Sequence, residues 1–288
     1  MLTRFFIYFI CYPLAALPLC VLYVLAFPLY LILNYVVRYR RKVVELNLSR
    51  SFPEKSKREL RHLRNQYYWH LVQIAVEMIK MMMLSPRNLK RRYYCSNPEL
   101  VNRFYEEGRS VILMSSHHNN WEWMILALDT MFKHHGVGVG KQNTNKVFEK
   151  LINRARTRYG TEVVFADTVR ETFERYESEH QPAAYMMLSD QSPNSKKKCY
   201  VTDFLHQKTG VIYGAEYFGR KYDIPVLYYE VIKERWGYYR VDVQVIAEHP
   251  NDLPQYEITE RYVRLLEHTI QKNPPFWLWS HRRWKFNL

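Results

Sequence analysis

An uncharged segment near the start of the chain constrains the fold more than any other feature. Residues 5–37 contain no Asp, Glu, Lys or Arg and consist mainly of Phe, Ile, Leu, Val, Tyr and Ala. Because a helix rises 1.5 Å per residue, about 20 residues suffice to cross the hydrocarbon core of a bilayer. The segment is also longer than the apolar region of a cleaved signal peptide. We therefore expect residues 1–37 to form a membrane anchor.

The sequence around this segment predicts its orientation but not its path. Four basic residues occur within residues 38–42, and such a cluster favours the cytoplasmic side of a membrane. Pro13, Pro18 and Pro28 interrupt the segment, and proline removes a helical hydrogen bond. A straight span and a broken or partly re-entrant helix are both compatible with this pattern.

The remaining residues, 38–288, have the length of one catalytic domain, which we expect to face the cytoplasm. No later stretch of comparable length lacks charges, which excludes a transporter with many spans. The formal net charge of +14 favours a polyanionic partner, either nucleic acid, an anionic membrane or a phosphorylated or acidic substrate. Four scattered cysteines without a CxxC pair indicate neither a disulfide framework nor a zinc site, and we expect no metal and no cofactor.

The middle of the chain alternates between strand-like and helix-like patterns. Strands are predicted at 110–115, 136–140, 161–165, 183–188, 224–231 and 238–245. Helices are predicted within 38–84, where Ser56 starts a helix, and at 121–132, 146–159, 169–179 and 257–271. This alternation predicts an α/β layered domain with a central mixed sheet flanked by helices, beside the N-terminal hydrophobic anchor helix.

A histidine and a carboxylate lie where the first of these strands gives way to a helix. His117 follows the apolar run of residues 110–115, and Asn119 or Asn120 is placed to cap the helix that follows. Glu122 lies in the first turn of that helix and is expected to fold back to the imidazole and fix its tautomer. A neutral imidazole can take the proton of an attacking alcohol, which predicts His117 and Glu122 as a catalytic pair.

This block resembles the late acyltransferases of lipid A biosynthesis, within the larger group of glycerolipid and lysophospholipid acyltransferases. Their signature is a His-x4-Asp/Glu box that commonly ends in Asn-Trp-Glu, as residues 120–122 do here. The resemblance covers almost the whole chain. It extends over the N-terminal anchor, residues 39–53, Asp190-Gln191, residues 204–210 and 224–226, and the ending 277–285. His118-Asn119 departs from the Phe-Gly that members often have after the histidine.

The resemblance implies further residues of the site region. It implies that Arg156, Asp190 and Asn120 bind substrate or organise the site. Arg156 is equally compatible with a solvated helix arginine, and Asp190 with an ordinary turn residue. His118 is expected to shape the pocket rather than to act as a second base.

The resemblance also implies a reaction and its partners. The donor would be an acyl carrier protein thioester, and the acceptor a hydroxyl of a lipid A precursor, a phosphorylated glycolipid. The site would lie at the anionic leaflet of the bacterial inner membrane, with no nucleic acid involved. Two alternatives stay open: an O-acyltransferase for a lysophospholipid or an aminoacyl lipid, and a non-enzymatic membrane-tethered protein that binds lipid or nucleic acid.

Overall fold

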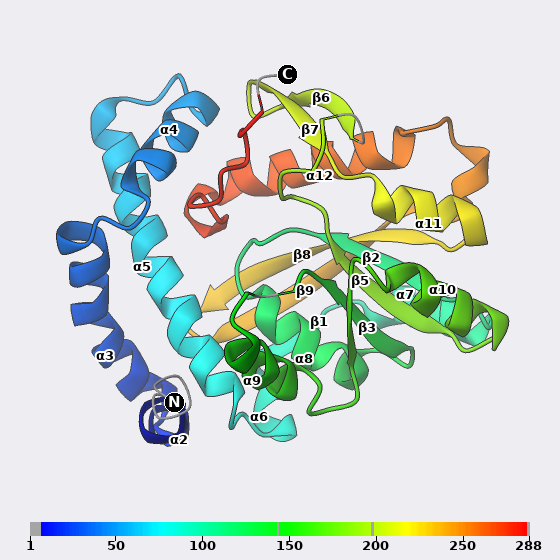
Figure 1. Ribbon diagram of the computed structural model, residues 1–288, viewed down its shortest axis with the longest axis horizontal. Coiled ribbons are helices and arrows are strands. Elements are labelled where there is room, and N and C mark those ends of the chain that lie inside the picture. Colours follow the sequence, from blue (N-terminus) through cyan, green and yellow to red (C-terminus); the bar gives the residue numbers. More distant parts are fainter. Residues whose placement is uncertain (1–6, 143, 197–198, 287–288) are drawn as a thin grey trace.

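A seven-stranded mixed sheet forms the centre of the computed structural model, which describes residues 7–142, 144–196 and 199–286 (Figure 1). In spatial order its strands are β1 (Tyr93–Cys95), β9 (Tyr238–Ala247), β8 (Val226–Arg235), β2 (Val111–Ser115), β5 (Ala183–Leu188), β3 (His135–Gly140) and β4 (Glu162–Phe165). Strands β8, β2, β5, β3 and β4 run parallel to one another. Within this sheet β9 pairs antiparallel with β8 and parallel with β1. The expected mixed sheet is therefore confirmed.

Helices cover both faces of this sheet. One face packs against α6 (Pro86–Arg92), α7 (Pro98–Glu106), α8 (Trp121–Met131) and α9 (Lys146–Arg156). The other packs against α10 (Val169–Ser178), α11 (Gly214–Tyr222) and α12 (Glu257–Lys272), beside the hairpin of β6 (Tyr200–Phe204) and β7 (Gln207–Val211). Strand β2 is buried on both faces, because Val111 and Leu113 belong to one core and Ile112 and Met114 to the other.

Two long helical segments lie beyond the carboxyl edge of the sheet. Helix α4 (Arg41–Ser51) leads into α5 (Lys57–Met81), which lies between the sheet and the N-terminal segment (Figure 1). Ser56 begins α5 with a capping box, since its hydroxyl accepts from the Glu59 amide while the Glu59 carboxylate accepts from the Ser56 amide. The helix start expected at Ser56 is thus confirmed.

The N-terminal segment is broken rather than straight. It consists of a π-helical turn η1 (Ile7–Cys11), α2 (Tyr12–Ala16), α3 (Leu19–Leu31) and a second π-helical turn η2 (Ile32–Val36). Leu17 is extended (ψ 150°) before Pro18, and this ends α2, whereas Pro28 lies within α3. Residues 19–36 are long and apolar enough to cross a membrane by length and composition. Only one side of this helix is exposed, however, because its other side packs along α5 (Figure 1).

Candidate active site

The parallel pairing of β2 and β5 brings a histidine and an aspartate together. Ser115 pairs with Leu188 at the carboxyl ends of the two strands, and the Ser189 amide donates to the Ser115 carbonyl at 3.1 Å. The chains then turn away, and His117 and Asp190 face each other. His117 Nδ1 lies 2.7 Å from Asp190 Oδ1, and the His117 backbone amide donates to Asp190 Oδ2 at 3.0 Å. Ligands and catalytic groups commonly gather at this edge of a parallel sheet.

Asp190 is held as a buried carboxylate. Its side chain is only 3% exposed, and Trp277 Nε1 donates a further hydrogen bond to Oδ2 at 2.9 Å. Burial raises the pKa of Asp190, but the nearby His117 and the hydrogen bonds outweigh it and lower that pKa to about 2. A permanent carboxylate at Nδ1 keeps the proton on that nitrogen and leaves the Nε2 lone pair available to accept a proton.

The second ring nitrogen of His117, Nε2, has an amide and an indole ring as neighbours. Gln191 Nε2 lies 3.2 Å from it, and the indole ring of Trp121 packs edge-on at 5.0 Å between ring centres. The His117 side chain is 16% exposed, so the ring is not completely closed off from solvent. The His117 ring thus has an acidic partner on one nitrogen and a neutral amide beside the other.

Glu122 does not pair with His117, which corrects the geometry expected from the sequence. Both Glu122 carboxylate oxygens accept from Arg156, Oε2 from Nε at 2.9 Å and Oε1 from Nη2 at 2.7 Å. Glu122 Oε1 also accepts from Trp121 Nε1 at 3.1 Å. A bidentate guanidinium satisfies the carboxylate more completely than one imidazole can, and α8 directs Glu122 toward α9. Arg156 is therefore not a freely solvated arginine.

Asn120 is buried, and both polar atoms of its side chain are hydrogen-bonded within the protein, while its expected contact with substrate stays a prediction. Its Oδ1 accepts from the Trp123 amide at 2.9 Å and caps α8, and its Nδ2 donates to Glu77 Oε2 at 2.6 Å. The cap expected at residue 119 or 120 is thus confirmed at 120. Glu77 also accepts from Tyr23 and Tyr239, so the start of α8 is fastened to α5.

His118 is a structural residue. It is 2% exposed, its Nε2 lies 3.3 Å from the Asn273 carbonyl, and it forms an isolated β-bridge with Trp277. Burial lowers the pKa of His118 to about 4, so the ring stays neutral at physiological pH. The expectation that His118 shapes the pocket rather than acting as a base stays a prediction.

The sequence analysis placed Asp190 in the site region but did not predict its hydrogen bond to His117. The signal was present, because 110–115 and 183–188 were both predicted as strands and a polar residue follows each of them. Their adjacency in the sheet was not visible from the sequence. The sequence also did not predict which residues surround the His117–Asp190 pair, namely Gln191, Trp121 and Trp277.

The sheet, the hydrogen-bonded His117–Asp190 pair at its carboxyl edge and the apolar N-terminal helix together describe an α/β protein with a candidate active site. The model of the family described as bacterial lipid A biosynthesis acyltransferase matches residues 1–286, and the chain belongs to this family. The protein is therefore an acyltransferase, and the alternative of a non-enzymatic binding protein is wrong. A comparison with curated proteins found no match.

Proposed function

We propose that this protein transfers a fatty acyl group from an acyl carrier protein thioester to a hydroxyl of a lipid A precursor. The observation that supports this most is His117, held on Nδ1 by the Asp190 carboxylate at 2.7 Å, with a side chain that is 16% exposed. Such a pair activates an alcohol without an enzyme nucleophile. Family membership supports the acyl transfer itself.

The proposed reaction proceeds through attack on the thioester carbonyl. His117 Nε2 takes the proton of the acceptor hydroxyl as its oxygen bonds to the carbonyl carbon. The carbon–sulfur bond then breaks, and the departing sulfur takes the proton from the imidazolium, which returns His117 to its neutral form. Asp190 stabilises the transient imidazolium and stays ionised throughout.

Glu122 and Arg156 act in this proposal through the position of Trp121. Glu122 Oε1 holds the Trp121 indole nitrogen, and the indole ring packs against His117. Arg156 in turn fixes Glu122 from α9. We regard Glu122 and Arg156 as positioning residues, and Asp190 as the partner of the base.

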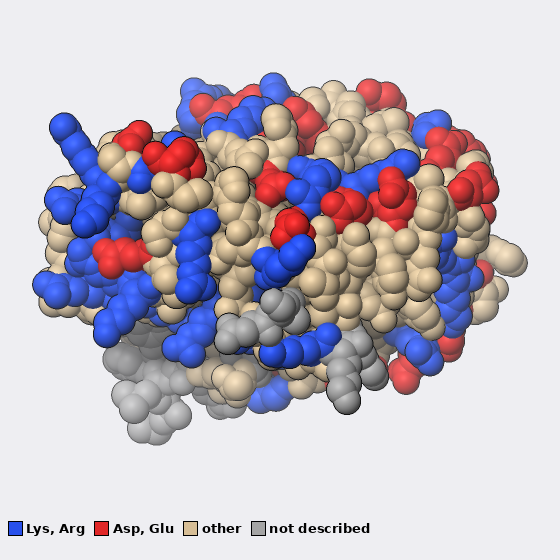
Figure 2. All heavy atoms as spheres, turned by 90° about the horizontal axis from the view of Figure 1, so that it is seen from above, with Lys and Arg blue, Asp and Glu red and all other residues tan. Residues whose placement is uncertain are grey.

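The basic surface supports the proposed partners. Figure 2 shows Lys and Arg side chains gathered at the left end of the molecule, over α4 and the start of α5, whereas both signs alternate elsewhere on that face. Exposed basic residues of this end include Arg38, Arg40, Lys42, Arg50, Lys57, Arg58 and Arg61. They would attract an acidic carrier protein, acceptor phosphates and the anionic cytoplasmic leaflet of the inner membrane.

Acyl transfer in detergent tests the proposal. Purified protein would receive acyl carrier protein thioesters with a lipid A precursor, and products would be read by mass spectrometry. We expect one added acyl chain, and a loss of about 10²–10⁴-fold in His117→Ala. The control is His62→Ala, which removes an exposed histidine of α5. Acylation of a lysophospholipid or an aminoacyl lipid alone would refute the acceptor, and full activity of His117→Ala would refute the mechanism.

A further inference from the structure

The N-terminal apolar segment is fastened to the catalytic domain at three places along its length. Near its start, the Lys80 ammonium donates to the carbonyls of Ala15 and Leu17, each at 2.9 Å, where the helix is broken. Further along, Tyr23 donates to Glu77 Oε1 at 2.5 Å. These contacts satisfy polar groups that would be strongly disfavoured without partners in lipid.

The third place is near the end of the segment. Asn34 is fully buried, and its side-chain amide donates to Asn65 Oδ1 at 3.2 Å and to Tyr30 at 3.3 Å. Leu19, Leu22 and Ala26 pack between these polar contacts against the domain. The segment from α2 to η2 is therefore hydrogen-bonded to α5 near its start, in α3 and near its end.

The outward side of the segment is apolar and uncovered. Val24 is 73% exposed and Val36 75%, although both are branched aliphatic residues. Other exposed apolar residues on this side are Leu25, Phe27, Ile32 and Val37. A contiguous apolar surface of this kind indicates a lipid or protein contact.

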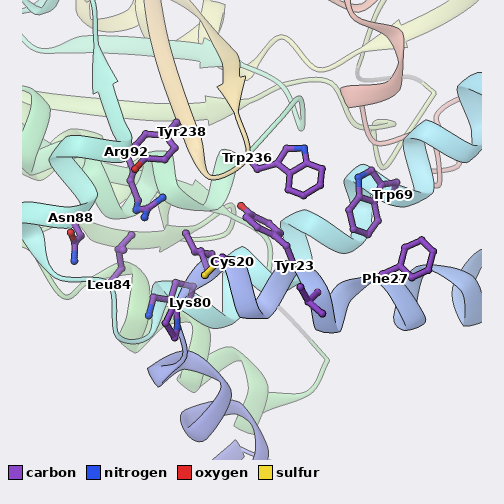
Figure 3. A pocket seen from close by; sticks show the side chains of 13 residues that line it. Cys20, Tyr23, Phe27, Trp69, Lys80, Leu84, Asn88, Arg92, Trp236 and Tyr238 are labelled. Atoms are coloured by element: carbon purple, nitrogen blue, oxygen red, sulfur yellow. The ribbon is translucent and has the colours of Figure 1, made fainter.

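An aromatic groove adjoins this surface. It has a volume of about 790 Å³ and lies between α3, the end of α5, α6 and the β8–β9 hairpin. Figure 3 shows Tyr23, Phe27, Trp69 and Trp236 turned toward one another along it, with Lys80 and Arg92 toward its other end. Tryptophan and tyrosine beside Lys and Arg are typical of the membrane–water interface, where rings meet acyl chains and cations meet phosphates.

Basic residues flank the segment at both ends. Residues 38–42 follow it directly. At its beginning, α6 lines the groove through Asn88 and Arg92, and the same short helix carries the exposed residues Arg87, Lys90 and Arg91. Basic residues favour the cytoplasmic face of a membrane, and here they favour it at both ends. A span would place one end on the opposite face.

A span would also place part of the catalytic domain in the hydrocarbon. The β8–β9 hairpin packs beside α3, with Trp236 5.5 Å from the Tyr23 ring, and it carries the exposed charged residues Glu234 and Arg235. Charged residues are strongly disfavoured near the bilayer centre. With α3 in the membrane plane, these charges reach the headgroups instead.

We infer that the N-terminal segment does not cross the bilayer but lies in the plane of the anionic cytoplasmic leaflet, with α3 and η2 embedded along their outward side and both ends on the cytoplasmic face. This inference does not depend on the proposed acyl transfer. Glu77 binds both Tyr23 and Asn120, so the embedded helix and the block that carries His117 share one buried carboxylate. The active site is thereby held at a fixed position relative to the leaflet.

Depth measurements on the full-length protein in vesicles of phosphatidylethanolamine and phosphatidylglycerol test this inference. Single spin labels would be placed at Val24→Cys and Val36→Cys, with the four native cysteines replaced by alanine. The two positions are about 18 Å apart along a helix axis. In-plane packing predicts equal, shallow depths within a few Å, whereas a span predicts depths that differ by most of 18 Å. A label at Tyr217→Cys on the distant α11 is the control and should stay in water.

The sidedness of the N-terminus gives a second readout that is independent of activity. A protease-cleavable peptide tag before Met1 should be cut in inverted inner-membrane vesicles and protected in spheroplasts. Unequal label depths, a lipid-embedded label at residue 217, or a tag cut in spheroplasts would each overturn the inference.

Discussion

At the scale of single residues, the Asp190 carboxylate determines which nitrogen of His117 carries the proton. In Asp190→Asn the amide keeps the shape but can donate to Nδ1, which favours the tautomer with the proton on Nε2. We expect kcat to fall by about 10³–10⁴-fold with a small change in KM. Steady-state kinetics across pH would test this, and Asp203→Asn, at an exposed carboxylate of β6, is the control. Unchanged kcat in Asp190→Asn would contradict the role assigned to Asp190.

The ion pair between Glu122 and Arg156 is a second interaction between single residues, and it contributes to stability. Glu122 is 5% exposed and Arg156 21%, so Arg156→Met leaves a nearly buried carboxylate without its partner. We expect a loss of about 3 kcal/mol in the free energy of unfolding, measured by urea denaturation in detergent. The double variant Glu122→Gln/Arg156→Met should recover a large part of that loss, because no charge is then left unpaired. Equal stability of the single and double variants would contradict the pairing.

At the scale of elements, Asn120 fixes where α8 begins and fastens it to α5. Asn120→Ala removes the cap on Trp123 and the hydrogen bond to Glu77, and we expect a loss of about 2–3 kcal/mol in unfolding free energy. Ser56→Ala removes only an exposed cap of α5 and should cost about 1 kcal/mol. Urea denaturation of both variants tests this, and an equal loss in the two would show that the Glu77 contact contributes nothing.

At the scale of the whole molecule, buried histidines make stability depend on pH. Burial lowers the pKa of His118 and of His134 to about 4, against about 6.5 in an unfolded chain. Between these values the unfolded state binds more protons, so acid favours unfolding. We expect the contribution of these two histidines to stability to be constant above about pH 7.5 and to fall from about pH 6.5 toward 4, by up to 1.4 kcal/mol per pH unit for each histidine.

Asp190 adds a second decline at lower pH. Its folded pKa of about 2 lies below the ordinary value, so its contribution is present above about pH 4 and is lost as the pH falls toward 2. Urea denaturation at pH 8, 6.5 and 5 would measure the histidine part. His134→Gln should flatten the slope, and a stability that rises from pH 7 to 5 would contradict the assignment.

The sequence by itself determined the local elements. Residues 110–132 read as strand, turn and helix because apolar runs, an asparagine cap and helical spacing are properties of neighbouring residues. The apolar segment and the alternation of strands and helices are local in the same sense, and the resemblance to the lipid A acyltransferases rests on ordered motifs along the chain. All of these appear in the structure and in the family match.

Only the tertiary structure decided which carboxylate serves His117. Glu122 is five residues away in sequence, yet α8 points it at Arg156, whereas Asp190 is 73 residues away and reaches the imidazole because β2 and β5 are neighbours. The path of the apolar segment was decided in the same way, by Lys80, Glu77 and Asn65 of α5. The composition of the segment predicts that it prefers lipid. Its direction depends on its packing against α5, and these contacts join elements that are far apart in the sequence.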